Sequence, residues 1–334
     1  MFQVFMKLKE VVMTNRIDIH NHLIPEEYVS LLATLGIKGT PAVDFPSWSP
    51  KKALKVMDRN GIRTAILSMS TPGTYFKDDA FSRKLTRVTN EYSAELISRY
   101  PGRFGAFAAL PLPDVGGALA EIEHSLDTLG LDGVGLLTNY QGIYLGDPRF
   151  ETIFTELDRR EAVVFVHPDD HLVMEDRYAI LTPILERPLE TTRAVTNLLT
   201  SGTLARYPKI RFILAHGGGA VPFLAERIAA GAALNGTAWP ALDRSLIAPV
   251  DIDEGLELLR RLYFDTAQPG EAHLETVKEF AGVEHILFGT DSGWVTPIDS
   301  RLTTRAVSTF NGFSEAQHRL VDRDNALPLF PRFA

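Results

Sequence analysis

Short runs of β-branched and aromatic residues alternate along this chain with longer segments whose apolar residues have helical spacing. Consecutive strand–helix units of this kind are typical of a parallel sheet covered by helices. The predicted strands are residues 17–20, 64–68, 104–109, 133–137, 163–167, 211–216, 262–265 and 285–290. Eight such units predict an α/β fold of the (β/α)8 TIM-barrel class in a single domain.

Helix boundaries between these strands carry recognisable signals. Ser49 precedes Pro50, and Asp147 precedes Pro148, which are the cap and first-position residues that begin helices. Gly130 and the Pro101-Gly102 pair stand where helices are expected to end. We therefore expect a helix after each strand, with residues 1–13 as an N-terminal extension and 14–334 as the barrel.

Three connections are longer than the rest. Residues 21–49 follow the first strand and 169–187 follow the fifth, and long connections in compact domains are commonly functional. Residues 235–250 are polar and contain proline, which predicts a surface excursion without an assigned role.

Charge and composition narrow the class of partner. The chain has 34 basic and 42 acidic residues, a net charge of −8, and no run of Lys or Arg, which argues against nucleic acid or an anionic membrane as a partner. No apolar run has the length of a membrane span, and Lys7, Lys9 and Glu10 interrupt the segment where a signal peptide would be apolar. We expect a cytoplasmic protein.

Cysteine is absent, so any transition-metal chemistry falls to the nine histidines and to carboxylates. Ligand-type residues stand at the ends of five predicted strands, and the carboxyl ends of barrel strands form one face. These residues are His20 with His22, His167, His216, Asp265 and Asp291. Their placement predicts a site at that face.

The spacing of His20 and His22 puts both imidazoles on one side of a strand, because strand side chains alternate with a period of two. With His167 and Asp291 they offer three nitrogens and one oxygen, a set that suits zinc and is acceptable to manganese or iron. Each histidine alone could instead bond a neighbouring loop. His171 faces either substrate or solvent, and solvated or capping roles are expected for the remaining four, which are His124, His273, His285 and His318.

His216 introduces three glycines, Gly217 to Gly219, which let a ligand or a backbone approach closely. A flexible turn would explain the glycines but not the histidine, so we expect His216 to act as an acid/base or to orient substrate beside the metal. Asp265 either supports a metal-ligating histidine or caps the next helix.

Four motifs resemble the amidohydrolase superfamily, in its decarboxylase branch that includes aminocarboxymuconate semialdehyde decarboxylase. They are Ile17-Asp18-Ile19-His20-Asn21-His22, Phe165-Val166-His167-Pro168, Ala215-His216-Gly217-Gly218-Gly219 and Phe288-Gly289-Thr290-Asp291-Ser292. The segments Ser68-Met69-Ser70-Thr71-Pro72-Gly73 and Ala326-Leu327-Pro328-Leu329-Phe330-Pro331 are most similar to the 6-methylsalicylate decarboxylase type.

The resemblance implies one divalent ion per chain, zinc first and manganese as the alternative, bound by His20, His22, His167 and Asp291 with His216 beside it. Two-metal relatives use a lysine at the end of strand four, where this chain reads Leu137-Thr138-Asn139, so a mononuclear site is expected.

A substrate arginine and an oligomer are also implied. Arg227 follows His216 by eleven residues, like an arginine that contacts a substrate carboxylate across a dimer interface in the branch, so a homodimer or higher homo-oligomer is expected. A surface salt bridge on its helix is the alternative for Arg227. Asp44 stands where a second carboxylate-binding arginine occurs, which argues against a dicarboxylate substrate.

The implied reaction is non-oxidative decarboxylation of a small hydroxyaromatic monocarboxylate such as 6-methylsalicylate, with CO2 leaving after Asp291 or His216 protonates the ring carbon. Four aromatic residues in strand-end loops could hold the planar ring or could simply pack within their loops; they are Trp48, Tyr75, Tyr140 and Trp294. A metal-dependent hydrolase of a lactone or amide is the alternative enzyme, and a non-catalytic metal-binding scaffold is the third hypothesis.

Overall fold

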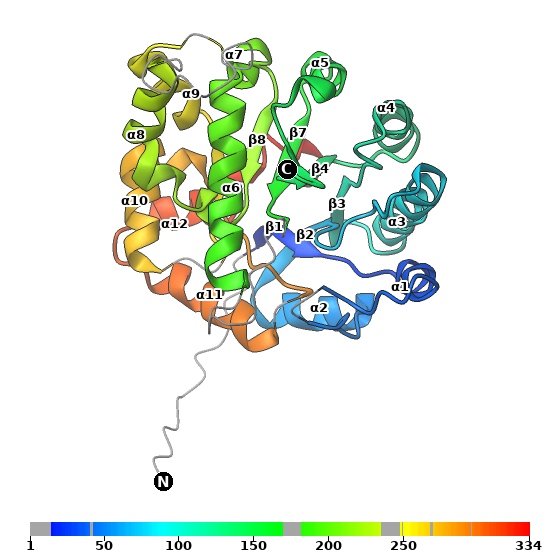
Figure 1. Ribbon diagram of the computed structural model, residues 1–334. Coiled ribbons are helices and arrows are strands. Elements are labelled where there is room, and N and C mark those ends of the chain that lie inside the picture. Colours follow the sequence, from blue (N-terminus) through cyan, green and yellow to red (C-terminus); the bar gives the residue numbers. More distant parts are fainter. Residues whose placement is uncertain are drawn as a thin grey trace, which may run out of the picture.

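Eight parallel strands form one sheet that curves into a barrel, with helices around its outside (Figure 1). This computed structural model describes residues 15–40, 43–169, 182–234, 248, 250–267, 270–294 and 296–334. The strands follow one another in the order β1-β2-β3-β4-β7-β8-β9-β10. They are β1 (Arg16–His22), β2 (Ile62–Ser68), β3 (Phe104–Ala108), β4 (Gly133–Leu137), β7 (Val163–His167), β8 (Arg211–Leu214), β9 (Tyr263–Asp265) and β10 (Ile286–Leu287). The predicted (β/α)8 barrel is confirmed.

Helices separate the strands as the sequence predicts. They are α1 (Glu26–Ala33), α2 (Pro50–Arg59), α3 (Asp79–Arg99), α4 (Val115–Glu123), α5 (Glu151–Arg159), α6 (Thr182–Thr200), α7 (Thr203–Arg206), α8 (Val221–Ala233), α9 (Ile252–Arg260), α10 (Glu271–Ala281), α11 (Pro297–Thr309) and α12 (Glu315–Asp322). The Ser49 hydroxyl caps α2 by accepting a bond from the Lys52 amide at 3.3 Å. Asp147 instead caps a short 3₁₀ turn that leads into α5.

The barrel closes through main-chain bonds between β1 and the segment after β10. The Ile19 amide donates to the Phe288 carbonyl at 2.9 Å, and the Asp291 amide donates to the His20 carbonyl at 2.8 Å. Because the chain bends toward β1 directly after Leu287, the last strand is two residues long rather than the six predicted. The same bend carries Asp291 to the first strand.

Aromatic rings fill the inside of the barrel and close its lower end. The Phe107 and Phe165 rings stack at 5.3 Å, and Phe330 from the C-terminal segment contacts Phe107 edge-on at 5.8 Å. The Phe165 ring also contacts the imidazole of His20 at 5.0 Å. The polar end of β1 therefore stands on an apolar floor.

One of the long connections, and the segment after β4, contain structure that was not predicted from the sequence. Residues 21–49 include α1, which buries Tyr28 and Leu32 on one face. A small hairpin, β5 (Asn139–Tyr140) with β6 (Ile143–Tyr144), follows β4. Residues 170–181, 235–247 and 249 lie outside the described residues, as do residues 1–14. Within the described chain, no helix is both long and apolar enough to cross a membrane.

A buried arginine joins the start of the barrel to its end. Arg16 donates from Nε to Asp322 at 2.8 Å and from its two terminal nitrogens to the Asn60 carbonyl and the Ser308 hydroxyl. Its guanidinium also lies over the Phe288 ring, 5.0 Å from the centroid. Each of the three guanidinium nitrogens donates one bond, so β1 is held against α11 and α12.

We predict that Arg16→Met lowers the free energy of unfolding by about 3 kcal/mol, because it leaves the Asp322 carboxylate without its cation in a buried place. Urea unfolding followed by circular dichroism measures the change. Arg319→Met is the control, since Arg319 lies on α12 with its side chain 75% exposed in its pair with Asp324, and we expect about 0.5 kcal/mol or less there. Equal losses in the two variants would contradict the role of Arg16.

Candidate metal centre

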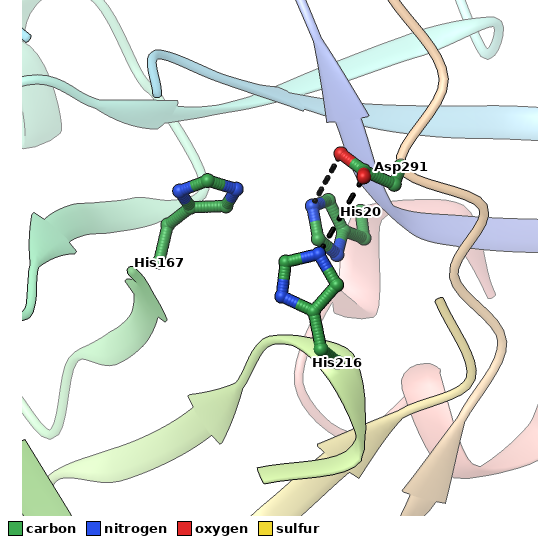
Figure 2. Close-up of side chains that lie close together, drawn as sticks. All are labelled: His20, His167, His216 and Asp291. Carbon is green, nitrogen blue, oxygen red and sulfur yellow. Dashed lines mark hydrogen bonds and ion pairs between the residues drawn. The ribbon is translucent and has the colours of Figure 1, made fainter. Parts of the chain in front are cut away.

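Four of the predicted site residues meet at the carboxyl end of the barrel (Figure 2). His20 comes from β1, His167 from the end of β7, His216 from the turn after β8 and Asp291 from the segment after β10. One ligand atom from each lies within 4.8 Å of the others. The side chains of His20, His167 and Asp291 are buried, and that of His216 is 12% exposed.

His22 belongs to the same cluster through a tight triangle with His20 and Asp291. Its Nε2 atom lies 3.0 Å from His20 Nε2 and 3.0 Å from Asp291 Oδ1, and His20 Nε2 lies 3.2 Å from that oxygen. Ligand atoms on a tetrahedral ion with bonds of about 2.0–2.1 Å are about 3.3 Å apart. The triangle therefore has nearly the size that one bound ion requires.

The other ring nitrogen of each buried histidine is already engaged. His20 Nδ1 lies 2.5 Å from Asp265 Oδ2, His22 Nδ1 lies 3.2 Å from the Ser68 carbonyl, and His167 Nδ1 lies 2.9 Å from the Pro168 carbonyl. These oxygens accept, so each Nδ1 carries a proton and Nε2 is the atom through which each ring can bind a cation. His167 Nε2 is buried and has no hydrogen-bond partner among the described residues.

Three Nε2 atoms and the Asp291 carboxylate therefore lie close together, which is an arrangement that a cation stabilises. Burial lowers the pKa of His20, but the carboxylates of Asp265 and Asp291 outweigh burial and raise it to about 10. Burial and the neighbouring histidines hold the pKa of His167 well below its usual range. Positive charge is thus favoured at His20 Nε2, where a divalent ion competes with the proton.

Asp265 connects the His20 side chain with the turn that carries His216. One carboxylate oxygen accepts from His20, and the other accepts from the Gly217 amide at 3.1 Å and the Ala267 amide at 2.9 Å. Of the two sequence interpretations, support of a histidine therefore holds. His216 has a positive φ of 55°, and its Nε2 lies 3.5 Å from Asp291 Oδ2.

Asp18 is a further buried carboxylate near the cluster, and the sequence singled it out only as a member of the Ile17–His22 motif. Its carboxylate accepts from the Thr290 hydroxyl at 2.6 Å, from the Thr290 amide at 3.0 Å and from the Asn21 side chain at 3.0 Å. Burial raises its pKa to about 6 despite these bonds. Asp18 shares its strand face with His20 and His22, and this parity was the available signal.

A second polar network supports the segment after β7. Asn139 donates to the Asp169 carbonyl and to the carboxylate of Glu190 on α6, both at 3.3 Å. The Thr138 hydroxyl accepts from the Asp169 amide at 2.9 Å. Glu190 is buried and also accepts from the Tyr144 hydroxyl at 2.7 Å. The end of β4 thus positions the chain just beyond His167, where sequence alone offered no signal.

The predicted aromatic residues are spread over several places. The Trp48 ring contacts Tyr92 on α3 at 6.2 Å, and the Trp294 ring contacts Phe45 at 5.6 Å. Tyr140 is buried in the core, where its hydroxyl accepts from the Leu137 amide at 3.1 Å. Tyr75 is partly buried before α3. His171 lies outside the described residues.

Arg227 lies exposed on α8 and forms no ion pair with any described residue. The salt-bridge alternative for Arg227 therefore has no partner in the described chain. His273, expected to be solvated or to cap a helix, is instead partly buried, and its ring bonds the turn after His216.

Comparison with known proteins places this site in a family context. A family model described as amidohydrolase matches residues 17–332. The chain is 36% identical over 333 residues to 6-methylsalicylic acid decarboxylase of Penicillium expansum, covering 95% of this chain and 96% of that one. It is 36% identical over 336 residues to decarboxylase yanB of Aspergillus niger, covering 96% and 88%.

A solved structure has the same fold. Dihydroxybenzoic acid decarboxylase of Polaromonas sp. JS666, crystallised with manganese and the inhibitor 2-nitroresorcinol, superposes with a TM-score of 0.77 over 95% of this chain and 97% of that one. Its sequence identity is 21%, so it supports the fold.

We predict that Asp265→Asn weakens binding of a divalent ion about 10- to 100-fold, because the amide can no longer accept the His20 proton as a carboxylate does. Titration of metal-free protein with Zn²⁺ against a competing chelator measures the affinity. Asp299→Asn is the control, since Asp299 is part of an exposed capping box on α11. Unchanged affinity in the Asp265 variant would show that His20 is not a ligand.

Proposed function

Because the chain belongs to the amidohydrolase family, in which its relatives are decarboxylases, we propose that it removes CO2 from a small hydroxyaromatic monocarboxylate of the 6-methylsalicylate kind. The enzyme is a decarboxylase of the amidohydrolase superfamily, and its relatives act on aromatic acids. The observation that carries the narrower proposal is the likeness to 6-methylsalicylic acid decarboxylase over nearly the whole of both chains.

The proposed ligands of one divalent ion are His20, His22, His167 and Asp291. Metal-binding histidines almost always donate their second ring N–H to a fixed acceptor, and all three of these histidines do so. His216 differs from them, because its Nδ1 is buried without a partner in the part of the chain that the structure describes. This difference supports His216 as a reacting group rather than a ligand, although its Nε2 is near the cluster.

Zinc is the proposed ion, because three imidazoles and one carboxylate are a donor set that zinc favours. Manganese is the alternative, since the same donors accept it and a neighbour of the same fold was crystallised with it. No lysine stands at the end of β4 in Leu137-Thr138-Asn139, which supports one ion rather than two.

The chemistry requires a proton at the ring carbon that bears the carboxylate, since loss of CO2 from an unprotonated ring would leave an aryl anion. When bound, the ion would hold the phenolate and carboxylate oxygens and stabilise the charge that develops on them. His216 and Asp291 lie side by side, with 3.5 Å between Nε2 and Oδ2, and they form the pair that holds and delivers this proton. The apolar floor below His20 limits the approach of substrate to the carboxyl end of the barrel.

We predict that His167→Ala abolishes both metal binding and CO2 release, whereas His216→Gln abolishes CO2 release and keeps about one ion per chain. The first change removes a ligand and the second removes a proton carrier, which should cost about 100-fold or more in kcat. Elemental analysis and a CO2-release assay on ortho-hydroxybenzoates, including 6-methylsalicylate, are made on the same samples.

His318→Gln is the control, because its ring lies on α12 against Phe313 at 5.4 Å, away from the cluster. Loss of metal from His216→Gln would make His216 a ligand and remove its proposed role. Metal-loaded enzyme that releases no CO2 from any ortho-hydroxybenzoate but hydrolyses a lactone or amide would favour the hydrolase alternative.

A homodimer is the proposed assembly, with Arg227 reaching the substrate carboxylate in the partner's site. Arg227 stands on α8 beside an exposed apolar residue, Phe223, which is 81% exposed one turn earlier. Further exposed apolar side chains lie on the neighbouring helices α6 and α9 (Figure 1). These are Ile184, Leu185 and Ile252. Exposed apolar groups of this kind favour association.

We predict that Arg227→Ala and His216→Gln, each inactive alone, recover CO2 release when they are mixed and allowed to exchange subunits. A mixed dimer has one site with an intact His216 and an Arg227 from the other subunit. The CO2-release assay before and after subunit exchange measures the gain, with light scattering to give the oligomeric state. Absence of recovery in a mixture shown to contain mixed dimers, or a monomer at micromolar concentration, would refute the cross-subunit role.

A further inference from the structure

The turn after β8 is held at the two peptide groups that flank the Cα of Gly217. The Gly217 amide donates to Asp265 Oδ1 at 3.1 Å, and the Gly217 carbonyl accepts from His273 Nε2 at 3.1 Å. Asp265 comes from the end of β9 and His273 from α10, so two separate elements form hydrogen bonds with Gly217, the residue that follows His216.

The backbone of this turn is strained and needs such support. His216 has a φ of 55° and Gly217 a φ of 60°, both in the left-handed region. For a residue with a side chain this conformation is unfavourable and persists only where the surroundings impose it. A Cβ atom on Gly217 would lie 2.6 Å from the His273 ring, so the glycine is also required by the closeness of His273.

His273 is placed to act on the turn and not on solvent. Leu274 and Val277 of α10 are buried, which fixes the helix against the barrel, and the His273 ring is partly buried between the helix and the turn. Burial lowers the pKa of His273 more than its bond to Gly217 raises it. The ring is therefore neutral near pH 7, with its one proton on the Nε2 that faces the carbonyl.

We infer that His273 is a positioning residue, whose bond to the Gly217 carbonyl sets the place of the His216 imidazole relative to Asp291. The consequence for turnover rests on the proposed function, because it needs His216 to take part in proton delivery. The geometric part of the inference does not need it.

The hydrogen bonds of Asp265 also connect the turn that carries His216 with His20. Asp265 accepts a hydrogen bond from the Gly217 amide on one oxygen and from His20 Nδ1 on the other. The position of the turn is therefore tied to a buried ring of the cluster. His273 holds the next peptide group through the Gly217 carbonyl, so the two bonds together limit rotation of the backbone on both sides of the Gly217 Cα. Without His273, the His216 Nε2 is free to leave its position 3.5 Å from Asp291 Oδ2.

Two shape-matched variants isolate the hydrogen bond. His273→Gln places an amide N–H where Nε2 stood, and His273→Glu has nearly the same shape but offers an oxygen to the carbonyl. Amide hydrogen exchange of residues 217–219, followed by mass spectrometry, reports the turn directly. We expect exchange about 10-fold faster in the Glu variant and close to the parent rate in the Gln variant.

Steady-state kinetics then tests the consequence for catalysis. We expect kcat for CO2 release to fall about 10-fold in His273→Glu, with KM and metal content unchanged, and to recover in His273→Gln. His285→Leu is the matched control, since His285 donates a ring N–H to the Leu262 carbonyl at 3.1 Å at the other end of the barrel. It should leave exchange at 217–219 and kcat unchanged.

Unchanged exchange in His273→Glu would overturn the inference, because the hydrogen bond would then not hold the turn. Equally fast exchange in both variants would also overturn it, because the imidazole ring rather than the hydrogen bond would then hold the turn. If the parent enzyme releases no CO2 from the substrates tried, the proposed function fails. The exchange comparison still decides the role of His273 in that case.

Discussion

Buried nitrogen and oxygen atoms that crowd around one point are the constraint on which this molecule is organised. The Nε2 atoms of His20 and His22 and an oxygen of Asp291 lie 3.0–3.2 Å apart, and His167 Nε2 is buried beside them with no hydrogen-bond partner among the described residues. Such an arrangement is costly in a protein interior unless positive charge lies at its centre. A bound divalent cation removes that cost, and its binding then contributes to folding.

The surrounding elements are arranged to keep those atoms aimed inward. Asp265 and main-chain carbonyls take the protons of the outer ring nitrogens, and Asp18 ties the loop of Asp291 to the first strand through Thr290. Below, the Phe165 ring keeps one side of the centre apolar. Above, the turn with His216 is the exposed and strained part. A strained turn on a rigid base is a common division in enzymes, because strain persists only where the surrounding structure is rigid.

Much of this was predictable from sequence because the barrel repeats one simple pattern. Strands buried on both sides, such as residues 133–137 and 163–167, are continuous apolar runs with the bounds that the structure shows. The end of the barrel was less predictable, since β10 is cut short by bonds to β1 that depend on residues far away in sequence. The environment of His273 was also hard to predict. Its position on a helix suggested a solvated ring, but the ring packs against the turn after β8 and bonds the Gly217 carbonyl. Tyr140 looked like a loop aromatic and is a core residue, because the β5–β6 hairpin folds its ring back inward.

Closure of the barrel also determines when the cluster can form relative to synthesis of the chain. His22 and Asp291 are 269 positions apart in sequence, and Arg16 and Asp322 are 306 apart. The first strand can therefore make these contacts only after almost the entire chain has been synthesised. Contacts between such distant positions form late. Until Asp291 and Asp322 have been synthesised, the chain has the four histidines of the cluster but lacks these two partners of the first strand. Completion of the cluster that contains His20, His22, His167 and Asp291 therefore follows synthesis of most of the chain, and any truncation before Asp291 yields a chain that lacks the carboxylate of this cluster.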